Sequence, residues 1–455
     1  MKSSREVLCY DISSGGLSAA RFNEQLENSA YHEVPWEVPL SASSLNRAFQ
    51  RVEHSISGDM PAAISISSFM HSFVVLDSDG HSKTPVYTWM DGASPDGIEA
   101  IRNVIGSGFH HRTGCHYHPM FPVFKLASEA MKNRSPANRI VSPKTLLVES
   151  LTGECVDDFG MAAASGLLNV HSANWDPDIL RAANLTASNL PKLMERDAIV
   201  GKTTSGCIVV NGSGDGFMAN IGSGCESSSR IAITLGTSAA VRQMVMKPVL
   251  DPSAGTFCYR ATSGNAFLLG CASNNGGNAL DWARREFGTP TADYVPNREI
   301  PVFLPWLHGE RSLEWNSDLR PSWHGRKADH TPFELQRSVM EGVLFNLAQY
   351  VEVIEKSSGV RANQIVLSGN AFLDPAVAPV LSALVSRDTL QPSSSGLGTL
   401  RGAAVCAWRA LGYDPTPEIE RLLNEAAPIA PVRIPGLDER FARFKQLRQL
   451  NSEEI

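Results

Sequence analysis

The stretch DISSGGLSAARFN, residues 11–23, has a counterpart in IAITLGTSAAVRQMV, residues 231–245. In each, a strand-like apolar run reaches a short turn of hydroxyl and glycine residues, and a second strand-like run leaves that turn. One copy lies in each half of the chain. Such weak internal similarity indicates two related domains that face each other.

The turn SSGG after Asp11 is not a dinucleotide or Walker-type phosphate loop. Those loops lead into a helix, whereas this turn leads into a strand. It is either a plain hairpin or a hairpin whose backbone N–H groups and hydroxyls bind a phosphate. In the second case Asp11 would hold Mg²⁺ through water. The matching turn GTS (236–238) favours phosphate binding, since a nucleotide held between two domains needs a turn from each side.

Composition limits the class of protein. The chain has 455 residues, of which 43% are hydrophobic and 19% charged, which are globular values that allow two or three domains. A net charge of −7 gives no basic surface and argues against nucleic acid as a partner. The eight cysteines form no CxxC pair, and no uncharged apolar run approaches the ~18 residues of a membrane span. We therefore expect a reduced, cytoplasmic protein that does not enter a membrane.

Apolar spacing predicts several helices. We expect one continuous helix over 123–133, a helix over 176–185 capped by Asp176 or Asp178, a long helix over 333–356, and a small-residue helix over 396–412 that packs closely through Gly402, Ala403 and Ala404. The tail from Pro428 is expected to end in a helix on the surface.

Asp215 is the strongest catalytic candidate. It stands in VVNGSGDGFMANIGSG, where small residues after a strand would let a ligand hydroxyl approach a single carboxylate. Such a carboxylate can accept the proton of a sugar hydroxyl as that hydroxyl attacks a γ-phosphate. The alternative is an ordinary Asp-Gly turn.

The segment HHRTGCHYHP contains a cluster of potential metal ligands. These are His110, His111, Cys115, His116 and His118. A zinc site is one interpretation, but no second ligand pair with regular spacing occurs elsewhere in the chain. Pocket lining and ordinary surface histidines are favoured instead.

Read in order, the segments resemble the FGGY family of carbohydrate kinases, gluconokinase branch. The resemblance rests on RTGCHYHPMFPVFKLA (112–127), SLTGECVDDFGMAAASGLLNVHSANWD (150–176), GSGDGFMANIGSGCESSSRIAITLGTSAAVR (212–242) and FCYRATSGNAFLLGCASNNGGNALDWARRE (257–286). It extends from about residue 7 to residue 412. It implies an α/β fold of two ribonuclease H-like (actin-like ATPase) domains with an interdomain cleft. The expected domains are 1–225 on the sugar side and 226–455 on the nucleotide side.

The resemblance also implies an activity, namely transfer of the γ-phosphate of Mg·ATP to a hydroxyl of gluconate or a related sugar acid, sugar or polyol. The implied cofactors are ATP and Mg²⁺, and the implied partner is a small-molecule carbohydrate. Because family members are often dimers, a homodimer is a further expectation.

Roles for individual residues follow from the same resemblance. Asp215 would be the general base and, with Asp11, would hold the metal. The implied cofactor-binding residues are Ser13, Ser14, Gly236, Thr237, Ser238, Gly277, Asp281 and Gly369. The implied sugar-facing residues are Met70, His71 and His118, while Arg112 and Lys125 are further candidate cations for an acidic substrate.

The chain departs from the family pattern near the cleft. Ser13 replaces a glycine of the first turn, and Ser18 stands where a lysine or arginine is usual. Arg21 is a poor substitute for that cation, because three residues further along a strand it would point to the face opposite to that of Ser18. Gly92 and Ser368 replace a usual arginine and glycine. These changes support an alternative function, a kinase-like protein with weak or lost catalysis that serves as a sugar-binding or regulatory module. An actin- or chaperone-type ATPase is disfavoured, because it would not need the sugar-facing segments.

Overall fold

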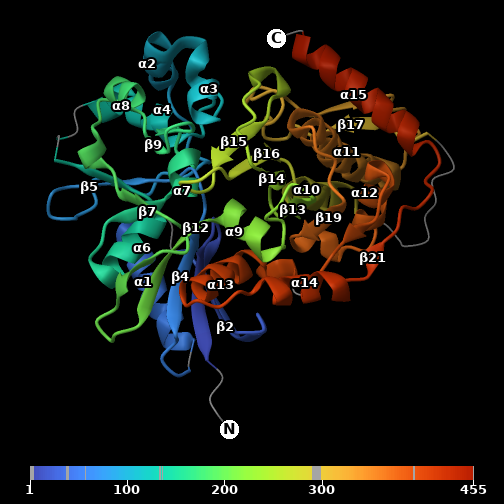
Figure 1. The fold of residues 1–455 in the computed structure, drawn as a ribbon. Coiled ribbons are helices and arrows are strands. Elements are labelled where there is room, and N and C mark those ends of the chain that lie inside the picture. The colour runs from blue at the N-terminus through green and yellow to red at the C-terminus, as the bar shows by residue number, and fades with distance from the viewer. Residues whose placement is uncertain are drawn as a thin grey trace.

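The computed structural model describes residues 5–36, 40–56, 58–132, 135, 137–288, 299–392 and 395–453. The chain forms two α/β halves, the first coloured blue to green and the second yellow to red in Figure 1. Each half is built around one large sheet.

The first sheet has six strands in the order β11-β12-β4-β1-β2-β3. Their bounds are β11 Ile199–Lys202, β12 Ile208–Gly214, β4 Ala63–Ser68, β1 Glu6–Ile12, β2 Gly16–Asn23 and β3 Asn28–Pro35. The second sheet has seven strands in the order β15-β16-β14-β13-β19-β20-β21. Their bounds are β15 Phe257–Arg260, β16 Phe267–Ser273, β14 Ala239–Val245, β13 Arg230–Leu235, β19 Gln364–Ser368, β20 Thr389–Leu390 and β21 Pro428–Ile429.

The two sheets share one connectivity. In the first, β1 pairs antiparallel with β2 and parallel with β4, and β4 pairs parallel with β12. In the second, β13 pairs antiparallel with β14 and parallel with β19, and β19 pairs parallel with β20. Both hairpins expected from the sequence are therefore confirmed, at equivalent places in two related sheets.

Each face of the first sheet packs on helices because successive side chains of a strand point to opposite faces. Val7 and Cys9 of β1 enter the core with α13 (Gly398–Ala410) and α9 (Asp215–Gly222), while Leu8 and Tyr10 enter the core with α1 (Ala42–Ser55) and α6 (Pro143–Thr152). One face of the second sheet packs on α10 (Gly277–Phe287), α11 (Pro332–Ser358) and α12 (Val377–Val385).

The remaining elements complete the two halves. The helices are α2 Pro95–Ile105, α3 Phe109–Thr113, α4 Pro122–Ala127, α5 Glu129–Lys132, α7 Phe159–Ala164, α8 Pro177–Ala182, α14 Thr416–Glu425 and α15 Leu437–Glu453. The short strand pairs are β5 Val74–Leu76 with β6 Arg139–Val141, β7 Val156–Asp158 with β10 Lys192–Met194, β8 Leu168–Asn169 with β9 Asn174–Trp175, and β17 Val302–Leu304 with β18 Ser322–His324.

Helix α13 comes from the second half of the sequence but packs against β1 and β4 of the first sheet and closely against α9. The contact depends on glycine: a Cβ on Gly402 would lie 2.0 Å from the carbonyl oxygen of Met218, and one on Gly222 would lie 1.9 Å from that of Gly398. The expected small-residue packing is confirmed. The expected division into 1–225 and 226–455 stays a prediction.

Two sequence expectations differ from the structure. The single helix over 123–133 is interrupted at Ser128, which has extended backbone angles and donates its hydroxyl hydrogen to the carbonyl of Lys125, a bond that competes with helix continuation. Asn133 lies outside the described residues. The C-terminal helix α15 is not merely a surface helix, because Phe444 and Arg448 are buried. By contrast, Asp176 caps α8 as expected.

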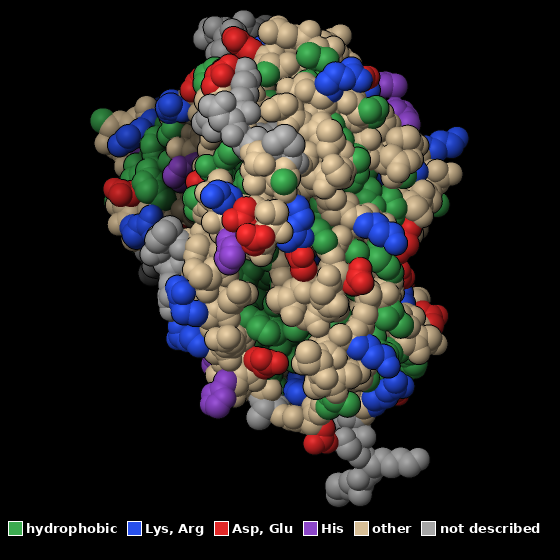
Figure 2. Space-filling model, turned by 90° about the vertical axis from the view of Figure 1, so that its left-hand side faces the viewer, with side chains coloured by type: hydrophobic (Ala, Val, Ile, Leu, Met, Phe, Trp, Pro, Cys, Tyr) green, Lys and Arg blue, Asp and Glu red, His purple; other side chains and the backbone are tan. Residues whose placement is uncertain are grey.

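On the face shown in Figure 2, lysine and arginine side chains are interspersed with aspartate and glutamate. None of the described helices combines the length and the apolar character that crossing a bilayer requires.

The α9–α13 contact is testable. We expect Gly402→Ala to lower the stability of the protein by about 1–3 kcal/mol, because the added methyl overpacks a backbone contact. Activity should fall as well, since α9 begins with Asp215. Thermal unfolding and initial rates measure both effects. Gly108→Ala is the matched control, because no atom lies within 4 Å of the added Cβ and the φ of Gly108 is −75°. An equal loss of stability in Gly108→Ala would contradict the packing argument.

Candidate active site

A cavity lies between the two halves. Both halves supply its wall, including Met70, His71, Trp89 and Asp215 from the first and Ser238, Arg242, Tyr259, Arg311 and Trp315 from the second. The cavity brings together four residues selected from the sequence, namely Met70, His71, Asp215 and Ser238.

Asp215 is the first residue of α9 and directly follows β12. One carboxylate oxygen accepts the backbone N–H of Gly216 at 2.7 Å. Burial raises the pKa of Asp215, while the positive charges of Arg242 and Arg311 act in the opposite direction. These arginines therefore favour the ionised form that a general base requires.

Asp11 lies near the end of β1, close enough to Asp215 for the charge of Asp215 to raise the pKa of Asp11. Its carboxylate is buried, and among the described residues its Oδ1 atom has no hydrogen-bond partner. Burial, followed by the charge of Asp215, raises the pKa of Asp11 to about 7. Two neighbouring buried carboxylates with an unpartnered oxygen fit a hard divalent cation such as Mg²⁺.

Of the residues expected on the nucleotide side, Gly236, Gly277 and Gly369 lie together, whereas Asp281 does not join them. The N–H of Gly277 donates to the carbonyl of Gly236 at 2.7 Å, and a Cβ on Gly369 would lie 2.4 Å from the carbonyl oxygen of Leu235, just before the second turn. No atom lies closer than 4.0 Å to the Cβ position of Gly236, so the turn is open to an approaching phosphate. Asp281 is mostly exposed and forms an ion pair with Arg284 at 2.9 Å.

The first turn differs from the second in its hydrogen bonds. The Ser13 hydroxyl oxygen accepts the N–H groups of Gly15 at 3.2 Å and Gly16 at 3.1 Å. These amides are thus already satisfied within the turn, whereas Ser14 is exposed. Among the described residues, no side-chain oxygen accepts an amide of the second turn, GTS. The first turn is therefore the weaker of the two as an anion site.

Arg21 does not supply the cation missing from the first turn. It lies on β2 opposite Leu8, whereas Ser18 lies opposite Asp11. Its guanidinium contacts Glu6 at 3.4 Å and borders a groove on the outside of the first half. The predicted orientation of Arg21 is confirmed.

His71 faces the cavity in a form suited to accept a hydrogen bond. Its φ of 59° is uncommon for a residue other than glycine and is the kind of backbone conformation found at functional sites. Nδ1 lies 2.7 Å from the carbonyl oxygen of Ala164, and burial lowers the pKa of His71 to about 3. The ring is therefore neutral, with the proton on Nδ1 and an acceptor lone pair on Nε2.

His118 does not line the cavity directly. Its ring lies edge-on to Trp315, 5.6 Å between centroids, and its Nε2 contacts the hydroxyl of Ser317 at 3.2 Å. It supports the cavity wall. The neighbouring rings of His110 and His116 pack 4.3 Å apart, and burial lowers both pKa values. Among the described residues, no three potential metal ligands of the segment HHRTGCHYHP come together, so the zinc interpretation is not supported.

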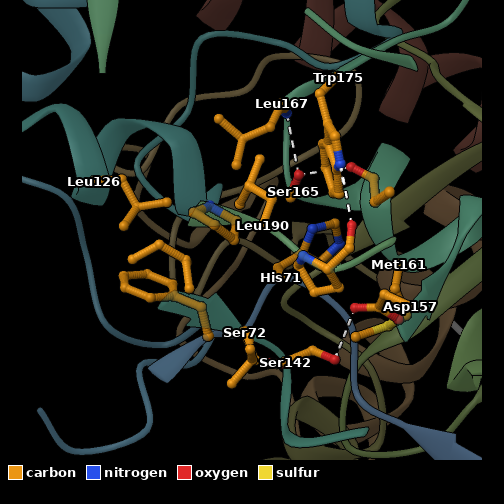
Figure 3. A pocket seen from close by; sticks show the side chains of 16 residues that line it. His71, Ser72, Leu126, Ser142, Asp157, Met161, Ser165, Leu167, Trp175 and Leu190 are labelled. Atoms are coloured by element: carbon orange, nitrogen blue, oxygen red, sulfur yellow. Dashed lines mark hydrogen bonds between the residues drawn. The ribbon is translucent and has the colours of Figure 1, made fainter. Parts of the chain in front are cut away.

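A second, small cavity lies behind His71 and is largely apolar. Figure 3 shows His71 projecting into this space, with the Ser142 hydroxyl donating to Asp157 at 2.9 Å. His71 lines both cavities. It thus forms part of the partition between the cavity beside Asp215 and the smaller cavity within the first half.

Two cations of the pocket, Arg242 and Arg311, were not among the sequence-derived candidates. Arg242 lies two residues after Ala240 and shares its strand face. This alternation after the GTS turn could have predicted that Arg242 faces the pocket. The sequence around Arg311, GERSLEW (309–315), contains no local pattern that predicts a side chain facing the pocket. The candidates that were chosen lie elsewhere: Arg112 pairs with Asp176 at 2.7 Å, and the Lys125 ammonium donates to the carbonyl of Met120 at 2.7 Å.

Two α/β halves of shared connectivity enclose two buried carboxylates, and each half supplies a hydroxyl-and-glycine turn. This is the arrangement expected of a two-domain phosphotransferase. Models of the FGGY family of carbohydrate kinases match the chain at residues 23–222 for the N-terminal domain and 231–411 for the C-terminal domain. The chain belongs to the FGGY family of carbohydrate kinases. It is an ATP-dependent sugar kinase, a phosphotransferase that acts on an alcohol group.

Individual relatives agree with this assignment. The chain is 28% identical to a gluconokinase of Bacillus subtilis over 451 residues, covering 89% of this chain and 88% of the relative. Its structure matches a gluconate kinase from Lactobacillus acidophilus with a TM-score of 0.86 at 25% identity, over 99% of each chain. It also matches a xylulose kinase from Lactobacillus acidophilus with a TM-score of 0.84 at 26% identity, over 99% of this chain and 97% of the other.

The self-bonded first turn generates a prediction. Ser13→Ala frees the amides of Gly15 and Gly16 for phosphate, and we expect the KM for ATP to fall about two- to tenfold, the value of one modest hydrogen bond. The KM for the sugar should not change. Steady-state kinetics with each substrate varied separately measure this. Ser188→Ala, at an exposed serine that does not line the cavity, is the control. A rise in the KM for ATP in Ser13→Ala would instead show that the Ser13 hydroxyl itself binds the phosphate.

Proposed function

We propose that this kinase phosphorylates gluconate or a closely related sugar acid. The observation that carries the proposal is the pair of arginines beside Asp215. In the part of the chain that the structure describes, neither Arg242 nor Arg311 forms an ion pair with a carboxylate, and the Nε atom of each is buried without a hydrogen-bond partner. The relatives named gluconokinase and gluconate kinase support the same substrate class.

The charge balance of the pocket favours an acid over a neutral sugar. Asp215 contributes one negative charge, whereas Arg242 and Arg311 contribute two positive charges to the same cavity. A bound carboxylate would offset the remaining charge, and a guanidinium binds a carboxylate through paired N–H donors. A neutral sugar could not form this paired contact, and the buried Nε atoms of both arginines would stay without a hydrogen-bond partner, which is unfavourable.

The residues of the cleft supply the remaining steps. Asp215 would accept the proton of the attacking hydroxyl, and His71 would orient the sugar by accepting a hydroxyl hydrogen at Nε2. Ser13, Ser14, Gly236, Thr237 and Ser238 would contact the phosphates, with Gly277, Gly369 and Asp281 toward the nucleoside. Asp11 and Asp215 would hold Mg²⁺, which neutralises the charge that develops on the phosphates during transfer.

A second function rests on a specific observation. Because Ser13 occupies two amides of the first turn, the chain would also suit a kinase-like protein with weak catalysis that binds a sugar or serves regulation. A homodimer remains a prediction for either function.

The two functions are separated by a substrate panel. We expect ADP release, coupled to an optical assay, to be fastest with gluconate among aldonates, ketoses and polyols at saturating Mg·ATP. We expect Asp215→Asn to fold normally and to lose about 10²–10⁴ in kcat, the usual contribution of a general base. Asp79→Asn, an exposed aspartate, is the control. Nucleotide and sugar binding without turnover in the unmodified chain would favour the second function.

The pocket arginines give a separate prediction. Arg311→Met and Arg242→Met should each raise the KM for gluconate about 10- to 100-fold, because each removes a charge-assisted hydrogen bond to the carboxylate. Selectivity for gluconate over the neutral polyol of the same length should fall correspondingly. Arg181→Met, whose side chain is 74% exposed, is the control. Equal losses on the acid and the polyol would contradict a carboxylate site.

A further inference from the structure

We propose that Arg448, on the C-terminal helix α15, is a positioning residue for the substrate pocket. It fixes the segment 310–315, which carries Arg311 and Trp315 into the cavity beside Asp215. This proposal rests on the proposed function in one respect, namely the identity of the ligand that Arg311 binds. Helix α15 runs along the outer edge of the second half (Figure 1), beyond residue 411, where the family model ends.

The contact between Arg448 and the segment is bidentate and buried. Nε of Arg448 donates to one carboxylate oxygen of Glu314 at 2.5 Å, and Nη2 donates to the other at 2.6 Å. Nη2 also donates to the carbonyl of Ser312 at 2.8 Å. The side chains of Arg448 and Glu314 are 3% and 7% exposed. A buried, forked pair of this kind fixes direction as well as distance.

The same guanidinium joins the segment to α11. Nη1 of Arg448 donates to the side-chain oxygen of Asn346, and the amide nitrogen of Asn346 donates to Glu310 at 2.8 Å. The hydroxyl of Tyr350, one turn further along α11, donates to the carbonyl of Ser312. Burial raises the pKa of Glu310 to about 7, and the positive charge of Arg448 opposes that shift. Arg448 thus helps to keep Glu310 ionised and in place.

The pocket-facing side of the segment depends on these anchors. The Arg311 backbone N–H donates to Glu310 at 2.8 Å, and its guanidinium donates to the carbonyl of Ser273 at 2.7 Å. Ser312 exchanges bonds with Ala272, whose side chain also lines the cavity. Residues 310–315 have no regular secondary structure beyond an isolated bridge from Glu310 to Asn316. Side-chain anchors therefore hold Arg311 in its place.

A purely structural role for Arg448 makes different predictions. If Arg448 only stabilises the second half, its replacement lowers the folded fraction and leaves the kinetic constants of the folded molecules unchanged. If it positions the pocket, the KM for the sugar rises while the KM for ATP stays the same. Lys445 offers a matched control, because it lies on the same helix and forms an ion pair with Glu352 in which the two side chains are 37% and 50% exposed.

The experiment uses the full chain with Arg448→Lys, Arg448→Gln, Glu314→Gln, the double variant Arg448→Gln/Glu314→Gln, and Lys445→Ala. Folding is checked by circular dichroism and thermal unfolding, and both KM values and kcat are measured with the carbohydrate that the unmodified chain phosphorylates fastest. Hydrogen exchange of the amides at 310–316, followed by mass spectrometry, reports on the segment independently of activity.

We expect Arg448→Lys to raise the sugar KM at least tenfold, with less than a threefold change in kcat and in the KM for ATP, because an ammonium cannot reproduce the fork. Exchange at 310–316 should accelerate in that variant and not in Lys445→Ala. The double variant should be no worse than Arg448→Gln alone, since the two side chains act as one unit.

Two results would overturn the proposal: an unchanged sugar KM in folded Arg448→Lys, or exchange at 310–316 that is no faster than in Lys445→Ala. Failure of the unmodified chain to prefer an aldonate would count against the proposed substrate alone. In that case the kinetic tests on Arg448 are carried out with the sugar that the unmodified chain does phosphorylate. If the chain phosphorylates none of them, hydrogen exchange at 310–316 alone tests whether Arg448 positions the segment.

Discussion

The burial of the Asp215 carboxylate between the two halves is the constraint on which the rest of the structure depends. A carboxylate in a closed cavity tends to take up a proton, and burial raises its pKa accordingly. In the proposed function, Asp215 acts as general base and must be ionised in a cavity from which water is excluded, and these two requirements oppose each other. The chain reconciles them with charge: Arg242 from β14 and Arg311 from the 310–315 segment lie in the same cavity and favour the ionised form.

Placing these groups together requires both sheets and the helices between them. Asp215 begins α9, whose position is set by backbone contact with α13 at Gly222 and Gly402. The repeated connectivity of the sheets places Asp11 beside Asp215 from the first half and Ser238 beside it from the second. A shift in any one of these elements would change the geometry at the carboxylate.

Much of this arrangement could be predicted from the sequence because it depends on local patterns. The two hairpins, the close packing at Gly402 and the capping of α8 by Asp176 all follow from turn, small-residue and cap signals. Arg311 could not be predicted in this way, because its direction is set by Glu310, Ser273 and Arg448, which are distant in sequence or buried for tertiary reasons. The burial of α15 escaped prediction for the same reason, since its pattern alone is mostly polar.

The distribution of cations separates the two ends of the cleft. At the first turn, Ser18 lies opposite Asp11 and Arg21 is paired with Glu6, so neither provides a cation for a phosphate. At the proposed sugar end, two guanidiniums line one cavity. In the proposed function, phosphate charge would be met mainly by backbone amides, hydroxyls and a divalent cation, whereas the proposed sugar end would retain the strong and directional charges. Because directional pairing discriminates among ligands more sharply than a diffuse field does, selectivity in this protein should reside in the sugar rather than in the nucleotide.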